Sequence, residues 1–95
     1  MGNVIRRHMY ISGDVQGVGF RYRANYAAKA LGLTGYVRNL YDGRVEVEVQ
    51  GERDLISRFL AEIDAGSFVH IDDIDWKDMP VVEDERAFHV RHDGY

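Results

Sequence analysis

Residues 4–32 read VIRRHMYISGDVQGVGFRYRANYAAKALG and decide the fold, because a strand, a glycine-rich loop and a helix follow one another within them. In residues 4–12 apolar and polar side chains alternate with the period of two that indicates a β-strand, with Arg7 as the exception. Residues 13–19 form the loop. Beyond it, apolar residues at spacings of three and four predict an amphipathic helix that ends near Gly32, namely Phe20, Ala24, Ala27, Ala28 and Leu31.

A second strand–helix unit follows the first. Residues 34–40 and 44–50 are predicted strands, and the Asp42-Gly43 pair between them is a typical hairpin signal. A second apolar stripe predicts a helix that ends at Gly66, with Leu55, Ile56, Phe59, Leu60 and Ile63 on its buried face.

The C-terminal third of the chain predicts two more strands. Val69 and Ile71 begin a strand whose apolar parity changes before Ile74, so a β-bulge is expected near Asp72-Asp73. Residues 87–91 predict a short last strand.

The order of these elements is βαββαβ plus a final strand. Right-handed crossovers then place the first and third strands centrally in an antiparallel sheet of four to five strands, with both helices on one face. We therefore expect an α+β, ferredoxin-like sandwich that forms a single domain over residues 1–95, with Phe59 and Trp76 in its core. This fold by itself decides no function, because it carries catalysts, RNA-binding domains and regulatory modules alike.

Composition and charge exclude several classes of protein. The chain has no cysteine, no apolar run near the ~20 residues of a membrane span, and an N-terminus without the apolar core of a secretion signal, so a cytoplasmic protein is expected. The net charge of −4 disfavours a general nucleic-acid binder. Residues 1–40 nevertheless carry six Lys/Arg against one acid, a local excess that permits a small anion site.

The loop before the first helix is the first candidate site. Its glycines allow backbone N–H groups to converge at a helix N-terminus, and Arg21 adds a planar, charged fork that suits two phosphate oxygens. An ordinary tight turn with a surface arginine is the alternative, and local chemistry leaves both open. The dinucleotide and P-loop motifs are absent, and the aromatic run that resembles an RNA-binding motif is not in the third strand, where that motif belongs.

Asn39, near the end of the second strand, is the second candidate. Its carboxamide fits a turn-forming role before Asp42-Gly43. Because the first and second strands run parallel in the expected fold, Asn39 would also project beside the loop that carries Arg21, where a polar amide could position water. Both roles stay open at this point.

Metal binding is not expected. His89 and His92 are three apart on a strand and so on opposite faces, and His8 and His70 have no obvious partners, whereas zinc needs three or four convergent ligands. The acidic run from Asp72 to Asp78 lacks the spacing and the glycine of a calcium loop.

These residues resemble the acylphosphatase family over nearly the whole chain. Residues 13–21 match its first signature, G-x-V-Q-G-V-x-F-R, and the second follows as Gly35-Tyr36-Val37-Arg38-Asn39, then Asp42-Gly43-x-Val45-Glu46 and Gly51. The chain departs from the family at Gly66-Ser67-Phe68, where Gly-Pro-Pro is usual, and at Tyr36, where tryptophan is common. A related domain occurs inside larger hydrogenase-maturation proteins.

The resemblance implies a hydrolase that cleaves acyl phosphates to a carboxylate and inorganic phosphate. It implies that Arg21 is the phosphate-binding catalytic arginine and that Asn39 positions the attacking water. Together with the loop chemistry, this predicts that the substrate phosphate is held by Val15, Gln16, Gly17, Val18, Gly19, Phe20 and Arg21. It also implies a monomeric enzyme without a cofactor. Composition, charge and ligand spacing predict no metal, nucleic-acid or membrane partner. The competing class is a non-catalytic anion-binding or regulatory module on the same fold, which would keep the anion cradle but would need neither Arg21 nor Asn39 in line with a reacting phosphate.

Overall fold

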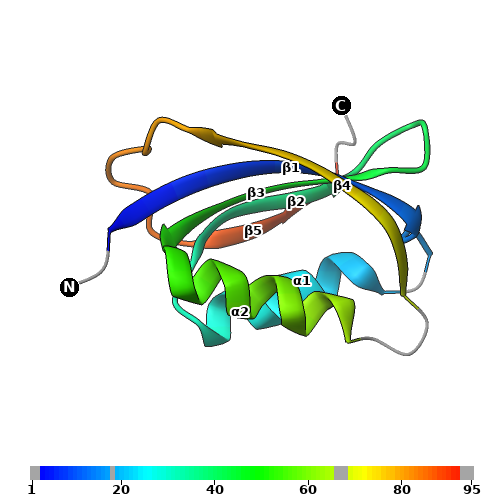
Figure 1. The fold of residues 1–95 in the computed structure, drawn as a ribbon, viewed down its shortest axis with the longest axis horizontal. Helices are drawn as coiled ribbons and strands as arrows, with labels where there is room; N and C mark the ends of the chain where they lie inside the picture. Colours follow the sequence, from blue (N-terminus) through cyan, green and yellow to red (C-terminus); the bar gives the residue numbers. More distant parts are fainter. Residues whose placement is uncertain (1–2, 18, 66–68, 93–95) are drawn as a thin grey trace.

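The computed structural model describes residues 3–17, 19–65 and 69–92. Its elements, in chain order, are β1 Val4–Asp14, α1 Phe20–Ala30, β2 Thr34–Asn39, β3 Val45–Glu52, α2 Arg53–Asp64, β4 His70–Met79 and β5 Phe88–Arg91. The strands form one five-stranded sheet in the order β4-β1-β3-β2-β5. Both helices lie side by side against one face of the sheet (Figure 1).

This arrangement confirms the predicted βαββαβ sandwich. β1 and β2 are each antiparallel to β3, so they point in the same direction and end at the same edge of the sheet. The sheet differs from the prediction in one respect: β5 runs parallel to β2, with Arg38 beside Arg91, so the sheet is mixed rather than wholly antiparallel. The predicted end of the second helix at Gly66 lies outside the described residues.

The predicted bulge in β4 is also confirmed. Ser12 pairs with Asp73 and the next residue, Gly13, pairs with Ile71, so Asp72 is the extra residue. Gly13 has φ 133°, and a Cβ at this position would collide with the carbonyl oxygen of His70. Glycine is required where the bulged strand approaches β1 so closely.

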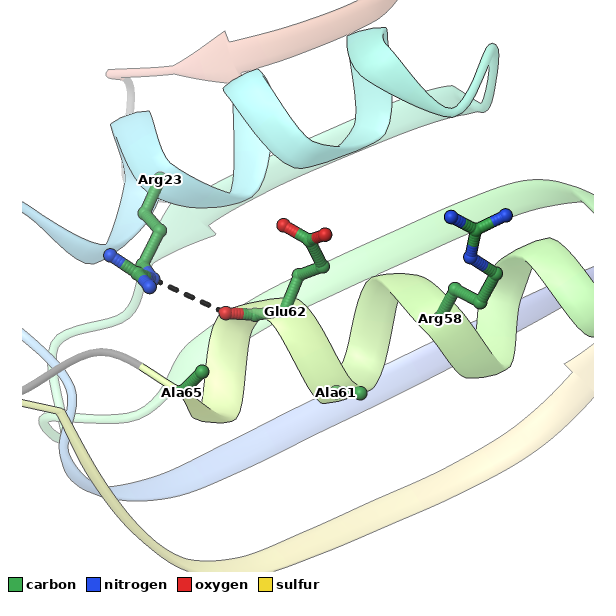
Figure 2. A pocket seen from close by; sticks show the side chains of 5 residues that line it. All are labelled: Arg23, Arg58, Ala61, Glu62 and Ala65. Carbon is green, nitrogen blue, oxygen red and sulfur yellow. Dashed lines mark hydrogen bonds between the residues drawn. The ribbon is translucent and has the colours of Figure 1, made fainter.

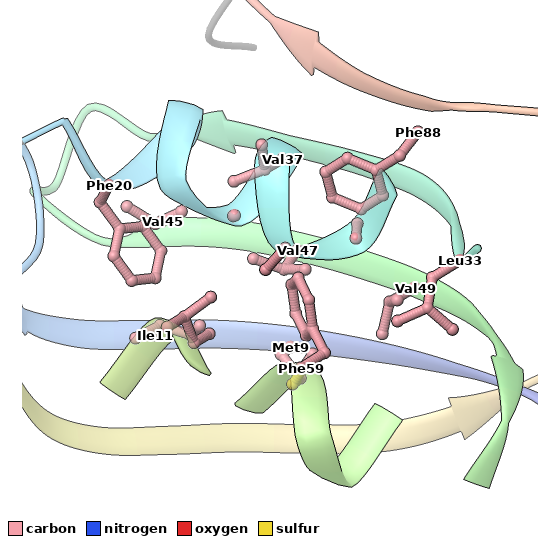
Figure 3. Packing of buried hydrophobic residues seen from close by; sticks show 14 of the residues in the cluster. Met9, Ile11, Phe20, Leu33, Val37, Val45, Val47, Val49, Phe59 and Phe88 are labelled. Carbon is pink, nitrogen blue, oxygen red and sulfur yellow. The ribbon is translucent and has the colours of Figure 1, made fainter. Parts of the chain in front are cut away.

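The core lies between the sheet and the helices (Figure 3). Alternate valines of β3 are fully buried there, and Phe59, as predicted, is 0% exposed. The prediction for Trp76 is wrong, because its side chain is 54% exposed. Trp76 faces the same side as its partner Met9, but it lies on an edge strand while the helices pack chiefly on β2, β3 and β5. The Arg7 guanidinium covers the indole instead, 4.0 Å from the ring centroid.

Polar residues on the other face of the sheet pair with one another. Arg6 is only 3% exposed and donates to Glu48, to Glu85 at 2.7 Å and to Gln50 at 3.1 Å. Glu85 belongs to the segment between β4 and β5, which crosses from one edge of the sheet to the other (Figure 1). Burial alone would raise the pKa of Glu85, but the hydrogen bonds that its carboxylate accepts, the strongest from Arg6, act together with the positive charge of Arg6 and lower that pKa below its ordinary value.

The expectation that His8 and His70 have no partners is wrong. Nε2 of His8 lies 2.6 Å from Glu46 on the face of the sheet opposite the helices, and Nε2 of His70 lies 3.1 Å from Asp72. Burial would raise the pKa of Glu46, but hydrogen bonds from His8 and Arg38 lower it below its ordinary value. The stabilisation from this carboxylate is therefore present above its ordinary pKa and is lost as the pH falls through the lowered value.

Candidate active site

The glycine-rich loop is held between two buried side chains. Val15 and Phe20 are each 1% exposed and pack into the core at the two ends of the loop. Between them Gly17 and Gly19 both have φ 76°, a left-handed backbone that residues with a Cβ rarely adopt. Val18, which is also predicted to bind phosphate, lies outside the described residues.

The N-terminus of α1 is open to an anion. Gly19 is its N-cap and supplies no side-chain hydrogen bond, and the first turn contains no acidic residue. The first N–H groups of a helix have no partner within the helix, and the helix dipole favours negative charge beside them. The loop therefore ends at a site that suits an oxyanion.

The hydrogen bonds made by the Gln16 side chain were not predicted from the sequence. Its Nε2 donates to the carbonyl oxygens of Leu40 at 2.7 Å and Arg44 at 2.8 Å, which ties the loop to the β2–β3 hairpin (Gln16 thus contributes more than a backbone amide). No local pattern could have revealed these bonds, because the partners are backbone atoms more than twenty residues away.

We expect Gln16→Ala to lower the free energy of unfolding by about 1–2 kcal/mol, because two hydrogen bonds that join the loop to the hairpin are lost, although each carbonyl keeps one backbone donor. Urea denaturation of the variant measures the loss. Tyr26→Ala, at a residue 78% exposed, is the control and should change stability by no more than about 0.5 kcal/mol. Equal stability of the two variants would contradict a bracing role.

Arg21, in the first turn of α1, reaches the end of β5. Its Nη1 lies 3.4 Å from the carbonyl oxygen of Arg91, to which it donates, and 3.4 Å from Nδ1 of His92. The Arg21 side chain is half-buried, so these contacts hold one edge of the guanidinium while the group remains accessible to a ligand. These contacts place the Arg21 guanidinium at the edge of the sheet where β2 and β5 end.

Asn39 ends β2 at that same edge. It pairs with Val45, a fully buried residue, and so lies on the face of the sheet that the helices cover. Since Arg38 is beside Arg91 in the parallel pair, Asn39 and the end of β5 that holds Arg21 are neighbours. The oxygen Oδ1 of Asn39 is buried and accepts no hydrogen bond from any described residue.

That unpartnered oxygen is a chemical feature of the site. A buried polar atom without a hydrogen bond costs about 1–3 kcal/mol, and such atoms are usually satisfied by water or a ligand. An amide oxygen accepts a hydrogen bond from a water molecule and so orients the water's lone pairs away from itself. Asn39 therefore has the chemistry to hold a nucleophilic water beside an anion bound at the loop.

A hollow away from this edge has a different character (Figure 2). It measures about 400 Å³ and lies between α1 and α2, lined by Arg23, Arg58, Ala61, Glu62 and Ala65. Arg23 donates through Nε to the carbonyl oxygen of Glu62 at 3.3 Å, near the C-terminus of α2, where a cation is favourable. This hollow contains none of the predicted site residues.

Within residues 3–17, 19–65 and 69–92, no group of histidines and carboxylates is arranged to hold a metal ion. No helix in that part of the chain is long and apolar enough to cross a membrane.

Comparison with known proteins identifies the family. The family model named Acylphosphatase matches residues 7–90. The chain belongs to the acylphosphatase family. An acylphosphatase of Clostridium beijerinckii is 41% identical over 90 residues, which cover 94% of this chain and 100% of the relative. The resemblance seen in the two signatures is thereby confirmed.

Solved acylphosphatase structures have the same fold. The crystal structure of the Bacillus subtilis acylphosphatase matches with a TM-score of 0.84 and 31% identity, covering 92% of this chain and 98% of that one. The acylphosphatase from Coxiella burnetii matches with a TM-score of 0.83 and 39% identity, covering 94% of each chain. The chain is accordingly a hydrolase that acts on acyl phosphates.

Proposed function

We propose that this acylphosphatase holds the phosphoryl group of its substrate in the amides of residues 16–21 and the Arg21 guanidinium, while Asn39 positions the attacking water. The observation that carries the proposal is the buried, unpartnered Oδ1 of Asn39 at the strand edge that Arg21 also reaches. The open N-terminus of α1 supports the phosphate-binding half of it.

The reaction needs few catalytic groups. An acyl phosphate is a mixed anhydride, and its leaving group is a carboxylate whose conjugate acid has a pKa of about 4, so no general acid is required. The water oxygen forms a bond to phosphorus as the bond from phosphorus to the acyl oxygen breaks and its electron pair leaves with the carboxylate. The phosphoryl oxygens accept one proton of the water, which leaves inorganic phosphate.

Positioning and electrostatic stabilisation then supply the catalysis. Phosphoryl transfer passes through a loose transition state with charge spread over the equatorial oxygens. The Arg21 guanidinium donates to two of these oxygens at once, and the amides at the helix N-terminus donate to the others. Asn39 holds the water in line, so the site requires no separate carboxylate or histidine base.

A hydrolysis assay with benzoyl phosphate tests the activity. Rapid release of benzoate and phosphate by the purified chain is expected, with saturation kinetics. A protein that binds phosphate but leaves benzoyl phosphate intact would instead support the non-catalytic anion-binding module. Light scattering tests the separate expectation of a monomer.

We also expect inorganic phosphate to inhibit competitively and to raise Tm. A ligand that binds only the native state stabilises it by mass action, by about 2.7 kcal/mol at a hundredfold excess over its dissociation constant. Thermal melts at increasing phosphate, with ionic strength matched by chloride, measure the effect. A Tm that does not respond to phosphate would contradict the proposed cradle.

A further inference from the structure

We propose that Tyr22 and His92 form the surface that receives the acyl group, and that the enzyme therefore favours flat aromatic acyl phosphates over small aliphatic ones. This inference rests on the proposed function, because it takes the phosphate to be bound at Arg21. It concerns the part of the substrate that the phosphate cradle does not contact.

The two rings adjoin the Arg21 guanidinium. Tyr22 follows Arg21 directly in α1, and its ring centroid lies 6.0 Å from Cζ of Arg21. His92 follows β5, and its Nδ1 lies 3.4 Å from Nη1 of Arg21. The two ring centroids are 6.4 Å apart, with the ring planes inclined at 45°. An anion held by Arg21 is thus bordered by aromatic surface from two separate elements.

The geometry of an acyl phosphate directs its acyl group toward this surface. The carbonyl carbon is two bonds from phosphorus and its substituent is three bonds away, so the substituent projects beyond the atoms that grip the phosphate. The loop side of the phosphate adjoins Val15 and Phe20, which are each 1% exposed and belong to the packed core. Tyr22, by contrast, is 58% exposed and His92 is also exposed, so the acyl group has room on their side.

The chemistry of the surface selects among acyl groups. Two tilted rings offer offset-stacked or edge-to-face contacts to a third ring. A benzoyl group is flat and long enough to make these contacts, whereas an acetyl group ends at a single methyl. The surface is open rather than enclosed, so it discriminates modestly and admits many aromatic acyl groups.

Tyr22→Ala tests the inference. We measure KM for benzoyl phosphate and for acetyl phosphate, together with the inhibition constant of inorganic phosphate. The ratio of the benzoyl KM to the acetyl KM is expected to rise about three- to tenfold, the size of one lost aromatic contact. Phosphate has no acyl group, so its inhibition constant reports the cradle alone. Tyr22→Phe, which keeps the ring, should restore the ratio.

Tyr26→Ala is the matched control. Tyr26 lies one turn later in α1 and is 78% exposed, but it is not adjacent in sequence to Arg21. The substrate ratio should not change in this variant. A similar rise in the ratio for Tyr26→Ala, or an unchanged ratio for Tyr22→Ala, would overturn the inference.

His92 is tested by a pair of variants. His92→Ala should raise the benzoyl-to-acetyl KM ratio, and His92→Phe should retain it, because a ring rather than a nitrogen is what the acyl group contacts. If KM changes equally for both substrates in both variants, His92 is not part of the acyl surface. The inference and the proposed function fail in different ways. A parent enzyme that hydrolyses neither substrate refutes the function. An active enzyme whose benzoyl-to-acetyl KM ratio is the same in the parent, Tyr22→Ala and His92→Ala refutes only the acyl surface.

Discussion

Asn39→Ala is expected to lower kcat by about 10²–10³ while phosphate still binds. Loss of one preorganised polar group that acts in the transition state typically has an effect of this size. The phosphate would keep its contacts with Arg21 and the loop amides, so its inhibition constant should change little. Measuring kcat, the phosphate inhibition constant and Tm on one preparation separates catalysis from binding.

The stability of the Asn39→Ala variant carries separate information. Because Oδ1 of Asn39 accepts no hydrogen bond from the described residues, its removal leaves no buried donor unsatisfied, and Tm should not fall. Asn25→Ala is the matched control, since Oδ1 of Asn25 is also buried without a partner among the described residues. That variant should keep its activity. If kcat of Asn39→Ala is undiminished, Asn39 does not position the water and has only the turn-forming role.

Arg21→Lys is expected to reduce kcat/KM by about 10²–10³ and to weaken phosphate inhibition, although the positive charge is kept. A lysine is a point charge without the planar fork that donates to two phosphoryl oxygens in one orientation. Initial rates with benzoyl phosphate, measured against the parent enzyme, give the loss.

Arg23→Lys is the control for Arg21→Lys. Arg23 lies on the same helix but faces α2, where it donates to the carbonyl oxygen of Glu62. This substitution should leave kcat/KM unchanged. If Arg21→Lys were as active as Arg23→Lys, the assignment of the phosphate fork to Arg21 would be wrong.

Most of the fold could be predicted from periodicity and turn chemistry. The alternation in β1 and β3, the apolar stripes of the two helices and the Asp42-Gly43 hairpin are local patterns, and the observed elements end within a few residues of the predicted bounds. The change of parity in β4 indicated the bulge for the same reason, since each strand residue must face one side of the sheet. The two signature motifs likewise made Arg21 and Asn39 candidates before any geometry was known.

Contacts between distant segments could be decided only by the tertiary structure. The parallel pairing of β5 with β2 brings Arg91 and His92 to Arg21, and Gln16 reaches backbone carbonyls beyond the end of β2. Trp76 was misplaced because its apolar character says nothing about whether a helix covers its strand. Local patterns follow from the geometry of a single strand or helix, whereas these contacts depend on which elements pack together and in what register, and that is determined by the packing of the whole chain.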